Sequence, residues 1–481
     1  MEIQFPPLPL YADWGRPLRV ESTIDGLELV QGRIPPGLHG TWYRAGPDRQ
    51  FPPMLGEDVF IDGEGMVHQL RFDGDHVSYR SRWVQNERFK LQAAARRSLF
   101  GRYRNRYTND PSVATAHMGT SNTNVIHFAG KCLVLKEDGL PYEIDPDTLE
   151  TRGLFDFNGQ VRAISLTAHP KVDVVNDRLV TYSFQAKGDA TRDVVFYEFD
   201  NAGKIVDEIW FEAPYSSLVH DFAITPDYAI FPFFPLITDL ENLKRGGTFY
   251  RWHPKEDTVI AVVPRRRQGA GIRFFRGPAT SAGHMMNAFQ DGSQVNLDLC
   301  LYAGNCFPFF PTVEGETTTM VPPVLTRLSF ELESADTSMR SRVLCPTPGE
   351  MPRTDDRYQG LPYDNGFMIV MRGPDGGSAV GHLHLGSGKL DVFSFGKRTS
   401  VHEQQFVPRS PDAAEGDGWL LVIVNRLDDN HSDIAILDAR DITAGPVATL
   451  RLPVRIRSTF HGTWVPSETL SSGRYQGFTR P

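Results

Sequence analysis

Phe460-His461-Gly462-Thr463-Trp464-Val465-Pro466 stands close to the end of this 481-residue chain. The ends of a protein commonly fray, yet here a histidine lies among aromatic residues and glycine. This setting predicts that the C-terminal segment returns to the middle of the molecule. Three earlier histidines have comparable surroundings, namely His169, His220 and His284. We interpret the four imidazoles as converging on one metal ion.

Along most of the sequence, short apolar or alternating runs are separated by turn residues, a pattern typical of strands. Residues 125–128 and 132–135 are such runs, and so are residues 194–199 and 419–424. Turn dipeptides such as Asp73-Gly74 and Asp291-Gly292 are typical of hairpins. Helical periodicity is scarce, and residues 87–100 are the best candidate for a helix. The pattern predicts an all-β fold.

The strand-turn-strand units recur over the whole length without a linker, and 43 glycines and 35 prolines punctuate the sequence. We therefore expect residues 1–481 to form a single domain. A seven-bladed β-propeller with four-stranded blades accommodates this length, and a tandem of β-sandwiches is the alternative.

Charge and composition exclude several classes of function. A net charge of -9 and a pI near 5.9 argue against nucleic-acid binding and show no polybasic membrane patch. No apolar run approaches the ~20 residues of a spanning helix. The four cysteines form no CxxC pair, and the first residues lack the basic and apolar regions of a signal peptide. We expect a soluble cytoplasmic protein with reduced thiols and no stable membrane insertion.

The apolar residues 228–237 allow two interpretations. They form either an exposed lip for a membrane or hydrophobic substrate, or a buried strand followed by a packed loop. The two prolines at positions 232 and 235 favour the buried strand.

The wide spacing of the four histidines does not match a local zinc finger, but it suits a radial fold in which each blade contributes one side chain. Imidazole binds Fe, Cu, Ni and Zn, so the residues do not select the metal. A ligating histidine usually donates its second ring N–H to a carboxylate, for which Glu137, Glu350 and Glu403 are candidates. Alternatively, the histidines are structural; His253 and the pair His382 and His384 are comparable by spacing alone.

Several motifs resemble those of the carotenoid cleavage oxygenases, almost from end to end. Residues 40–47 and 60–68 resemble two early motifs of this family. Ala168-His169-Pro170, His220-Asp221-Phe222, His284 and Phe460-His461-Gly462 match its iron ligands in order. The resemblance implies a seven-bladed propeller with non-haem Fe(II) on its axis, capped by loops and short helices, and O2-dependent double-bond cleavage. It also implies that Glu137, Glu350 and Glu403 orient the ligand histidines.

A narrower resemblance is to the branch that cleaves lignostilbenes, resveratrol-like stilbenes and isoeugenol. Residues 99–105, 122–125 and 135–138 carry it. It implies that Tyr103 and Lys136 contact the 4-hydroxyl of the substrate, and that Thr123 crowds one open coordination position. A lysine and a tyrosine in a dry pocket stabilise a phenolate. Without the resemblance, Lys136 is interpreted as a surface ion pair with Glu137 or Asp138, and Tyr103 as a core aromatic.

The substrate pocket shows one departure from the lignostilbene enzymes, in which Phe precedes the acidic-glycine turn. Ile61 holds that position here, as in isoeugenol-cleaving relatives, with Phe60 just before it. Phe309 lies in a Phe-Pro-rich run that resembles the lignostilbene enzymes. The substrate prediction therefore covers both phenylpropenes and stilbenes.

We expect a small phenolic alkene and O2 as partners, with aldehydes such as vanillin as products. For the oligomeric state, both a monomer and a homodimer stay open. Two alternatives are a carotenoid or apocarotenoid substrate, and a non-catalytic propeller that binds partners.

Overall fold

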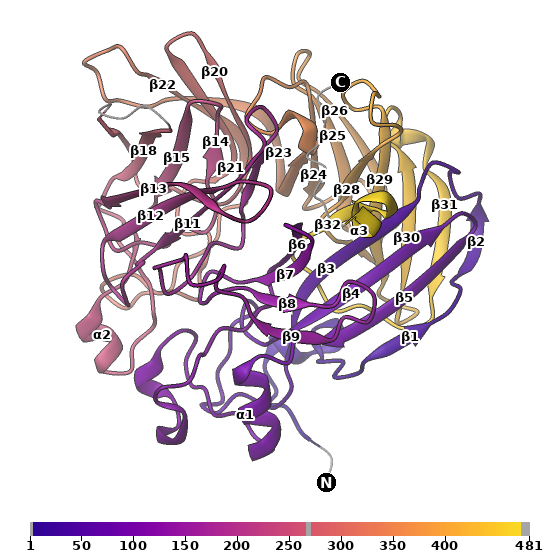
Figure 1. Cartoon of the computed structure of the whole chain (residues 1–481), viewed down its shortest axis with the longest axis horizontal. Coiled ribbons are helices and arrows are strands. Elements are labelled where there is room, and N and C mark those ends of the chain that lie inside the picture. Colours follow the sequence, from indigo (N-terminus) through magenta and orange to yellow (C-terminus); the bar gives the residue numbers. More distant parts are fainter. Residues whose placement is uncertain (1–2, 266–270, 473–481) are drawn as a thin grey trace.

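The computed structural model describes residues 3–265 and 271–472, whose regular structure is almost entirely antiparallel β-sheet. Figure 1 shows the sheets grouped around a common centre, with the backbone passing from one sheet to the next. The mostly β architecture is therefore confirmed. The single domain expected over residues 1–481 includes residues 1–2, 266–270 and 473–481, which lie outside the described residues.

Three sheets contain strands that pair in the order of the sequence. The first contains β6 (Asn124–Phe128), β7 (Lys131–Leu135), β8 (Tyr142–Ile144) and β9 (Thr151–Leu154). The second contains β10 (Lys171–Asp173), β11 (Arg178–Phe184), β12 (Asp193–Phe199) and β13 (Ile205–Glu212). The third contains β20 (Ser281–Asp291), β21 (Gln294–Tyr302), β22 (Val324–Glu331), β23 (Arg340–Thr354), β24 (Asn365–Val370), β25 (Ala379–His384) and β26 (Lys389–Ser394).

A further sheet follows β13 in the sequence and contains β14 (Ala223–Ile224), β15 (Tyr228–Phe233), β18 (Thr258–Pro264) and β19 (Arg273–Gly277). A small two-stranded sheet contains β16 (Leu236–Ile237) and β17 (Arg251–Trp252). Every residue of β15 after Tyr228 is buried. The interpretation of residues 228–237 as a buried strand is therefore confirmed over β15.

Two sheets join the first part of the sequence to the last. One has the order β1 (Ser22–Ile24), β5 (His76–Trp83), β4 (Glu64–Asp73), β3 (Gly40–Asp48) and β32 (Gly462–Pro466). The other has the order β2 (Glu28–Gly32), β31 (Pro446–Leu452), β30 (His431–Asp438), β29 (Gly418–Arg426) and β27 (Thr399–Val401), with β28 (Gln405–Pro408) also paired to β29. Trp42 lies opposite Trp464 in the first sheet. This pairing fixes the C-terminal segment within the fold, as its sequence predicts.

Local residue chemistry explains the hairpin between β6 and β7. Its two turn residues, Ala129 and Gly130, both have positive φ, at 49° and 73°. This is the backbone of a type I′ turn, whose twist matches that of paired strands. The strands predicted over residues 125–128 and 132–135 are confirmed, and they pair with each other.

The described helices are short: α1 (Glu87–Ala95), α2 (Leu240–Lys244) and α3 (Ser467–Ser472). The helix predicted over residues 87–100 is too long. Asn86 caps its start, because its side chain accepts a hydrogen bond from the Phe89 N–H. Arg96 ends it in the left-handed region, at φ 56°.

The core lies between neighbouring sheets. One cluster of buried residues joins β3 and β4 to β29, β30 and β31, and includes Trp42, Leu70, Ile434 and Leu450. Such packing buries one face of each sheet against the next. Over residues 3–265 and 271–472, no helix has both the length and the apolar character needed to cross a membrane.

Candidate metal centre and substrate cavity

The four histidines come from four separate places in the fold. His169 precedes β10, His220 precedes β14, His284 lies within β20 and His461 directly precedes β32. The register of β20 against β21 shifts between Ala282 and Met285, the interval that contains His284, and such an irregularity can re-aim a side chain. Three of the four thus lie just before a strand begins.

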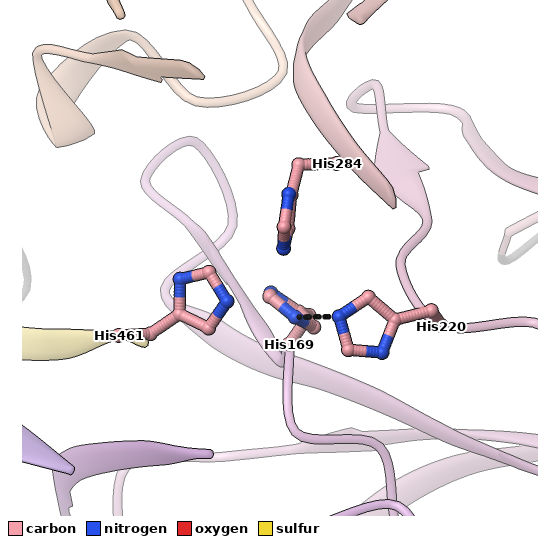
Figure 2. A group of neighbouring side chains, drawn as sticks. All are labelled: His169, His220, His284 and His461. Carbon is pink, nitrogen blue, oxygen red and sulfur yellow. Dashed lines mark hydrogen bonds between the residues drawn. The ribbon is translucent and has the colours of Figure 1, made fainter. Parts of the chain in front are cut away.

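Figure 2 shows the four imidazoles turned toward one another. One nitrogen from each ring lies within 4.8 Å of the corresponding nitrogens of the others. Nε2 of His169 and Nε2 of His220 are 3.1 Å apart. Nitrogens that share a metal ion at about 2.1 Å are separated by roughly 3 to 4 Å. The structure therefore brings together all four predicted histidines at a spacing that fits one ion.

Three glutamates hold the outer nitrogens of three rings. Nδ1 of His284 lies 2.7 Å from Glu350, Nδ1 of His461 lies 2.8 Å from Glu403, and Nδ1 of His220 lies 3.3 Å from Glu137. A ring that donates from Nδ1 keeps the Nε2 lone pair free for a metal. The structure places the three predicted glutamates where this role requires them.

His169 differs from the other three rings. The carboxylate that its Nδ1 faces is Asp221, at 3.9 Å. That distance is too long for a direct hydrogen bond, so no described glutamate or aspartate orients His169 in the way that the three glutamates orient the other rings.

A buried polar atom without a partner supports a metal at this point. Nε2 of His284 is buried and has no hydrogen-bond partner among the described residues. Leaving a buried nitrogen unsatisfied is costly. A neutral four-imidazole donor set, with one lone pair unused, fits a divalent first-row metal ion.

Electrostatics favour the neutral form of two of these rings, His169 and His461, and ligation requires neutral rings. Burial, together with the other histidines, lowers the pKa of His169 well below its usual value. Burial also lowers the pKa of His461 to about 4, although Glu403 acts in the opposite direction. At His284, burial acts to lower the pKa of the ring, but Glu350 outweighs it and the pKa is raised.

Arg44 supports the carboxylate behind His461. Its Nη1 donates to Oε2 of Glu403 at 2.6 Å, and both side chains are almost completely buried. Burial would raise the pKa of Glu403, but His461, Arg353 and Arg44 outweigh it and hold the pKa below its usual value. Arg44 lies in the early motif at residues 40–47, although we assigned it no role from the sequence.

A cavity of about 390 Å³ adjoins the histidines, and His220, His284 and His461 form part of its wall. Its wall includes every residue predicted for substrate or oxygen chemistry: Phe60, Ile61, Tyr103, Thr123, Lys136 and Phe309. It also includes Glu137 and Glu350, whereas Glu403 lies outside it. We call this space the substrate cavity.

Lys136 lines the substrate cavity rather than the protein surface, because only 4% of it is exposed. It does pair with Glu137, at 3.6 Å, but the pair is buried. Its Nζ lies 5.6 Å from the ring centre of Tyr103. Burial raises the pKa of Tyr103 well above its usual value, and Glu137 raises it further. Tyr103 is thus a protonated donor next to a buried lysine.

Thr123 lies in the wall of the same cavity and is 1% exposed. Its hydroxyl donates to Oδ1 of Asn122 at 2.9 Å, and its carbonyl accepts the backbone N–H of His461. Two hydrogen bonds therefore fix Thr123 next to one of the four histidines.

Aromatic rings form much of the remaining wall. Phe60 contacts Phe309 edge to face, with ring centres 5.7 Å apart, and it contacts Phe460 in the same way. Phe60 is 45% exposed, so it lies where the cavity meets solvent. Ile61 follows it in the wall.

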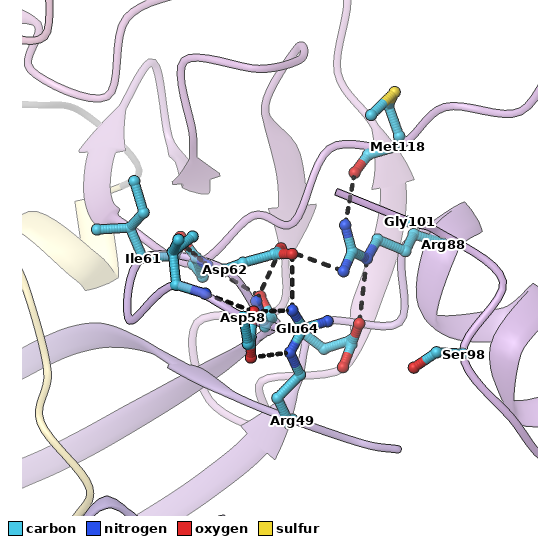
Figure 3. Close-up of polar contacts among 12 residues, drawn as sticks. Arg49, Asp58, Ile61, Asp62, Glu64, Arg88, Ser98, Gly101 and Met118 are labelled. Atoms are coloured by element: carbon cyan, nitrogen blue, oxygen red, sulfur yellow. Dashed lines mark hydrogen bonds and ion pairs between the residues drawn. The ribbon is translucent and has the colours of Figure 1, made fainter. Parts of the chain in front are cut away.

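A buried ionic network holds the Phe60–Ile61 loop (Figure 3). Asp62 lies 2.7 Å from Arg49 and 3.1 Å from Arg88, and Arg88 also pairs with Glu64. Asn122 donates to the carbonyl oxygen of Ile61 at 3.1 Å. The conspicuous acidic-glycine motif at residues 62–65 thus positions the cavity wall, although its residues do not line the cavity.

Comparison with known proteins agrees with this geometry. The family described as RPE65, retinal pigment epithelial membrane protein, matches residues 15–466. This protein belongs to that family, the carotenoid oxygenases.

Several named members are similar over nearly their whole length. The isoeugenol monooxygenase of Pseudomonas nitroreducens is 42% identical, with 94% of this sequence and 96% of that protein covered. The lignostilbene-alpha,beta-dioxygenase isozyme III of Sphingomonas paucimobilis is 38% identical, with 95% and 96% covered. The crystal structure of Pseudomonas brassicacearum lignostilbene dioxygenase has a TM-score of 0.93 at 40% identity, covering 97% of this sequence and 100% of that one.

Two residues of this carotenoid oxygenase that we did not identify from the sequence also line the substrate cavity. Tyr302 donates to Oε1 of Glu350 at 3.2 Å, and so supports the carboxylate behind His284. Tyr250 accepts a hydrogen bond from Arg104 at 3.0 Å. Both lie in strands or loops of ordinary composition, so no local pattern marks them.

Proposed function

We propose that this carotenoid oxygenase is a non-haem Fe(II) enzyme that uses O2 to cleave the alkene double bond attached to a 4-hydroxyphenyl ring. The substrate is of the isoeugenol or 4-vinylguaiacol type, or of the lignostilbene or resveratrol type, and the product is an aromatic aldehyde such as vanillin. One observation carries the proposal: the buried Lys136 and Tyr103 share a cavity with His220, His284 and His461. The names of the relatives support the same substrate class.

In this proposal His169, His220, His284 and His461 hold the iron, and Glu137, Glu350 and Glu403 orient three of the rings. Ferrous iron, when bound, supplies the redox centre at which O2 is activated. The protein contributes a set of neutral imidazoles with their outer N–H groups fixed. Thr123 narrows the space on the cavity side of the histidines, which is consistent with a role in limiting access to one coordination position.

Recognition of the phenol depends on Lys136 and Tyr103. The ammonium of Lys136 donates to the 4-oxygen and favours its phenolate form. The hydroxyl of Tyr103 stays protonated and donates to the same oxygen. Phe309 and its neighbours exclude water, and low polarity strengthens both interactions. A phenolate delocalises negative charge through the conjugated ring to the alkene, which activates the double bond toward an electrophilic oxidant.

The same proposal includes a seven-bladed propeller formed by one domain. β23 supports this interpretation: Arg340 to Pro348 pair with β22, whereas Gly349 to Thr354 pair with β24. If β23 belongs to two blades, its sheet divides into two four-stranded blades, β20–β23 and β23–β26. With the five other large sheets of the described residues, this gives seven blades. The loops that carry Tyr103 and Ile61, together with the short helix α1, would form the cap.

The four free, buried cysteines support a reducing compartment, and we propose a cytoplasmic enzyme without membrane insertion.

A substrate panel with iron quantified in the same sample tests the proposal. Isoeugenol, 4-vinylguaiacol, resveratrol and a β-apocarotenal are incubated with the enzyme, and aldehyde release is measured. Aldehyde from the phenolic alkenes at one iron per protein molecule supports it. Turnover of the β-apocarotenal alone would assign a carotenoid-type substrate. No iron uptake and no oxygen consumption after addition of Fe(II) would indicate a binding scaffold.

A further inference from the structure

A second cavity, of about 120 Å³, also reaches the histidines, and we call it the polar cavity. His169, His284 and His461 form part of its wall. Among the described residues, His284 and His461 are the two that line both cavities. Much of the remaining wall of the polar cavity comes from β6, β10, β20 and the segment around the end of β23. A bound metal would thus face two separate cavities.

Besides Nε2 of His284, three buried polar atoms in residues of its wall have no hydrogen-bond partner among the described residues. They are Nδ1 of His127, Oδ1 of Asn124 and Nε of Arg353. His127 and Asn124 are 6% and 8% exposed. Buried polar groups are normally satisfied, and a polar cavity of this size holds several waters. The polar cavity is therefore hydrated in solution.

The charged groups of the wall include more acids than bases. Asp221, Asp356 and Glu403 face Lys171 and Arg353. Lys171 pairs with Asp221 at 2.7 Å, and Arg353 lies 3.3 Å from Asp356. His127 adds an imidazole that is uncharged at neutral pH, because burial lowers its pKa to about 4.

The substrate cavity is a poor path for a metal ion by comparison. Phenylalanines form much of its wall, and its two carboxylates, Glu137 and Glu350, already pair with Lys136, His220 and His284. Removing a hydrated ion's water without replacing it by polar atoms is expensive. The waters, carboxylates and imidazole of the polar cavity replace that hydration in steps.

We propose that the divalent metal ion enters and leaves the histidine cluster through the polar cavity, past His127 and Asn124, while the substrate cavity admits the alkene. This inference rests on the metal centre of the proposed function, but not on the substrate assigned to it.

A path has a kinetic signature that a ligand lacks. Narrowing the path raises the barrier for entry and for exit equally, so both rates fall by the same factor and the Kd of the metal does not change. Damage to the histidine cluster, in contrast, changes the Kd.

Gln359→Trp provides the obstruction. Gln359 lines the polar cavity from the loop that follows a short 3-10 helix, Asp356–Tyr358, so the substitution leaves every strand intact. His127→Phe keeps an aromatic ring and removes the unpartnered nitrogen. Met320→Trp is the matched control, since Met320 lines the substrate cavity and is 36% exposed.

The experiment uses the full-length holoenzyme under anaerobic conditions. The rate of Fe(II) release to ferrozine and the rate of Fe(II) uptake by the metal-stripped protein are measured for each variant. We expect Gln359→Trp to slow both by at least about tenfold with an unchanged Kd. We expect a smaller slowing of both rates in His127→Phe, and wild-type rates in Met320→Trp.

Wild-type rates in both polar-cavity variants, or slowing in Met320→Trp alone, would overturn the inference. A change in one rate only, with a changed Kd, would also overturn it. If Gln359→Trp does not fold, His127→Phe alone decides the question. Absence of metal binding by the wild-type protein would instead refute the proposed metal centre.

Discussion

Lys136 and Glu137, neighbours in the sequence, connect the substrate cavity to the histidine cluster. Nζ of Lys136 lies 3.6 Å from Oε1 of Glu137, and Nδ1 of His220 lies 3.3 Å from the same oxygen. One carboxylate thus faces both the cation proposed for the substrate and a proposed metal ligand. Changes at Lys136 can therefore be compared directly with changes at the metal.

The first prediction concerns Lys136→Met. It removes the charge but keeps an unbranched side chain, while Glu137 keeps its contact with His220. A hydrogen bond between charged groups contributes about 1.5–3 kcal/mol, so we expect a loss of roughly 10- to 100-fold in kcat/KM on 4-hydroxylated alkenes. The loss on the 4-methoxy analogue should be much smaller.

The measurement is kcat/KM on the two matched substrates, with iron content checked. Lys131→Met is the control, because Lys131 belongs to the same hairpin but pairs with Glu143 at 2.8 Å. Equal losses on both substrates would remove the phenolate role of Lys136.

The second prediction concerns the carboxylates behind the metal ligands. Glu350→Gln replaces the partner 2.7 Å from Nδ1 of His284 with a neutral one. Loss of such a carboxylate typically weakens metal affinity 10- to 100-fold, and we expect roughly this change in the Kd for Fe(II). His284→Ala should weaken it further.

Competition with a chelator of known affinity measures both variants. His382→Ala serves as the control, since His382 is buried but lies 2.8 Å from Asn365, outside the histidine cluster. An iron-replete, fully active His284→Ala enzyme would exclude His284 as a ligand.

The third prediction concerns the ionic network of the Phe60–Ile61 loop. Arg49 is 2% exposed and pairs with Asp58 and Asp62. Arg49→Met leaves two buried carboxylates without this partner, and breaking a buried pair costs about 3–5 kcal/mol. We expect a comparable decrease in the free energy of unfolding, measured by urea denaturation.

Arg71→Met tests whether burial causes that cost. Arg71 also pairs with an aspartate, Asp147, but their side chains are 38% and 67% exposed. An exposed pair contributes about 0–1 kcal/mol. Similar decreases in the free energy of unfolding in the two variants would contradict the proposed importance of the buried network.

The fourth prediction concerns acid. Burial would raise the pKa of Asp62, but Arg49 and Arg88 outweigh it and lower the pKa to about 2, from 3.8. A carboxyl group with a lowered folded-state pKa stabilises the fold above its unfolded pKa, and this stabilisation is lost as the pH falls through the folded value. The contribution of Asp62 should therefore be complete above about pH 4 and should decrease between about pH 4 and pH 2.

Asp62→Asn isolates this effect. Its destabilisation relative to the wild type should be largest above pH 4 and should shrink as the pH approaches 2. Urea denaturation at several pH values measures it. A difference that does not vary with pH would show that Asp62 acts through shape alone.

Much of the fold could be predicted from short-range patterns. The apolar runs on either side of Ala129-Gly130 predicted strands β6 and β7, because apolar runs and the turn residues that bound them are properties of neighbouring residues. The helix prediction at residues 87–100 extended beyond Ala95, because composition alone did not reveal the left-handed cap at Arg96. The division of the strands into blades depends on β23, whose pairing changes along its length.

The sequence by itself determined which residue types were available: histidines in distinctive settings, glutamates near strands, and Lys136 next to Glu137. Only the tertiary structure decided which of them meet. It brought His169, His220, His284 and His461 together, left His382 with Asn365, and placed Lys136 in a cavity wall. It also placed Arg44 behind Glu403 and formed the polar cavity. The physical reason is that residue patterns encode local conformation and buried faces, whereas distances between remote side chains arise only when the sheets pack.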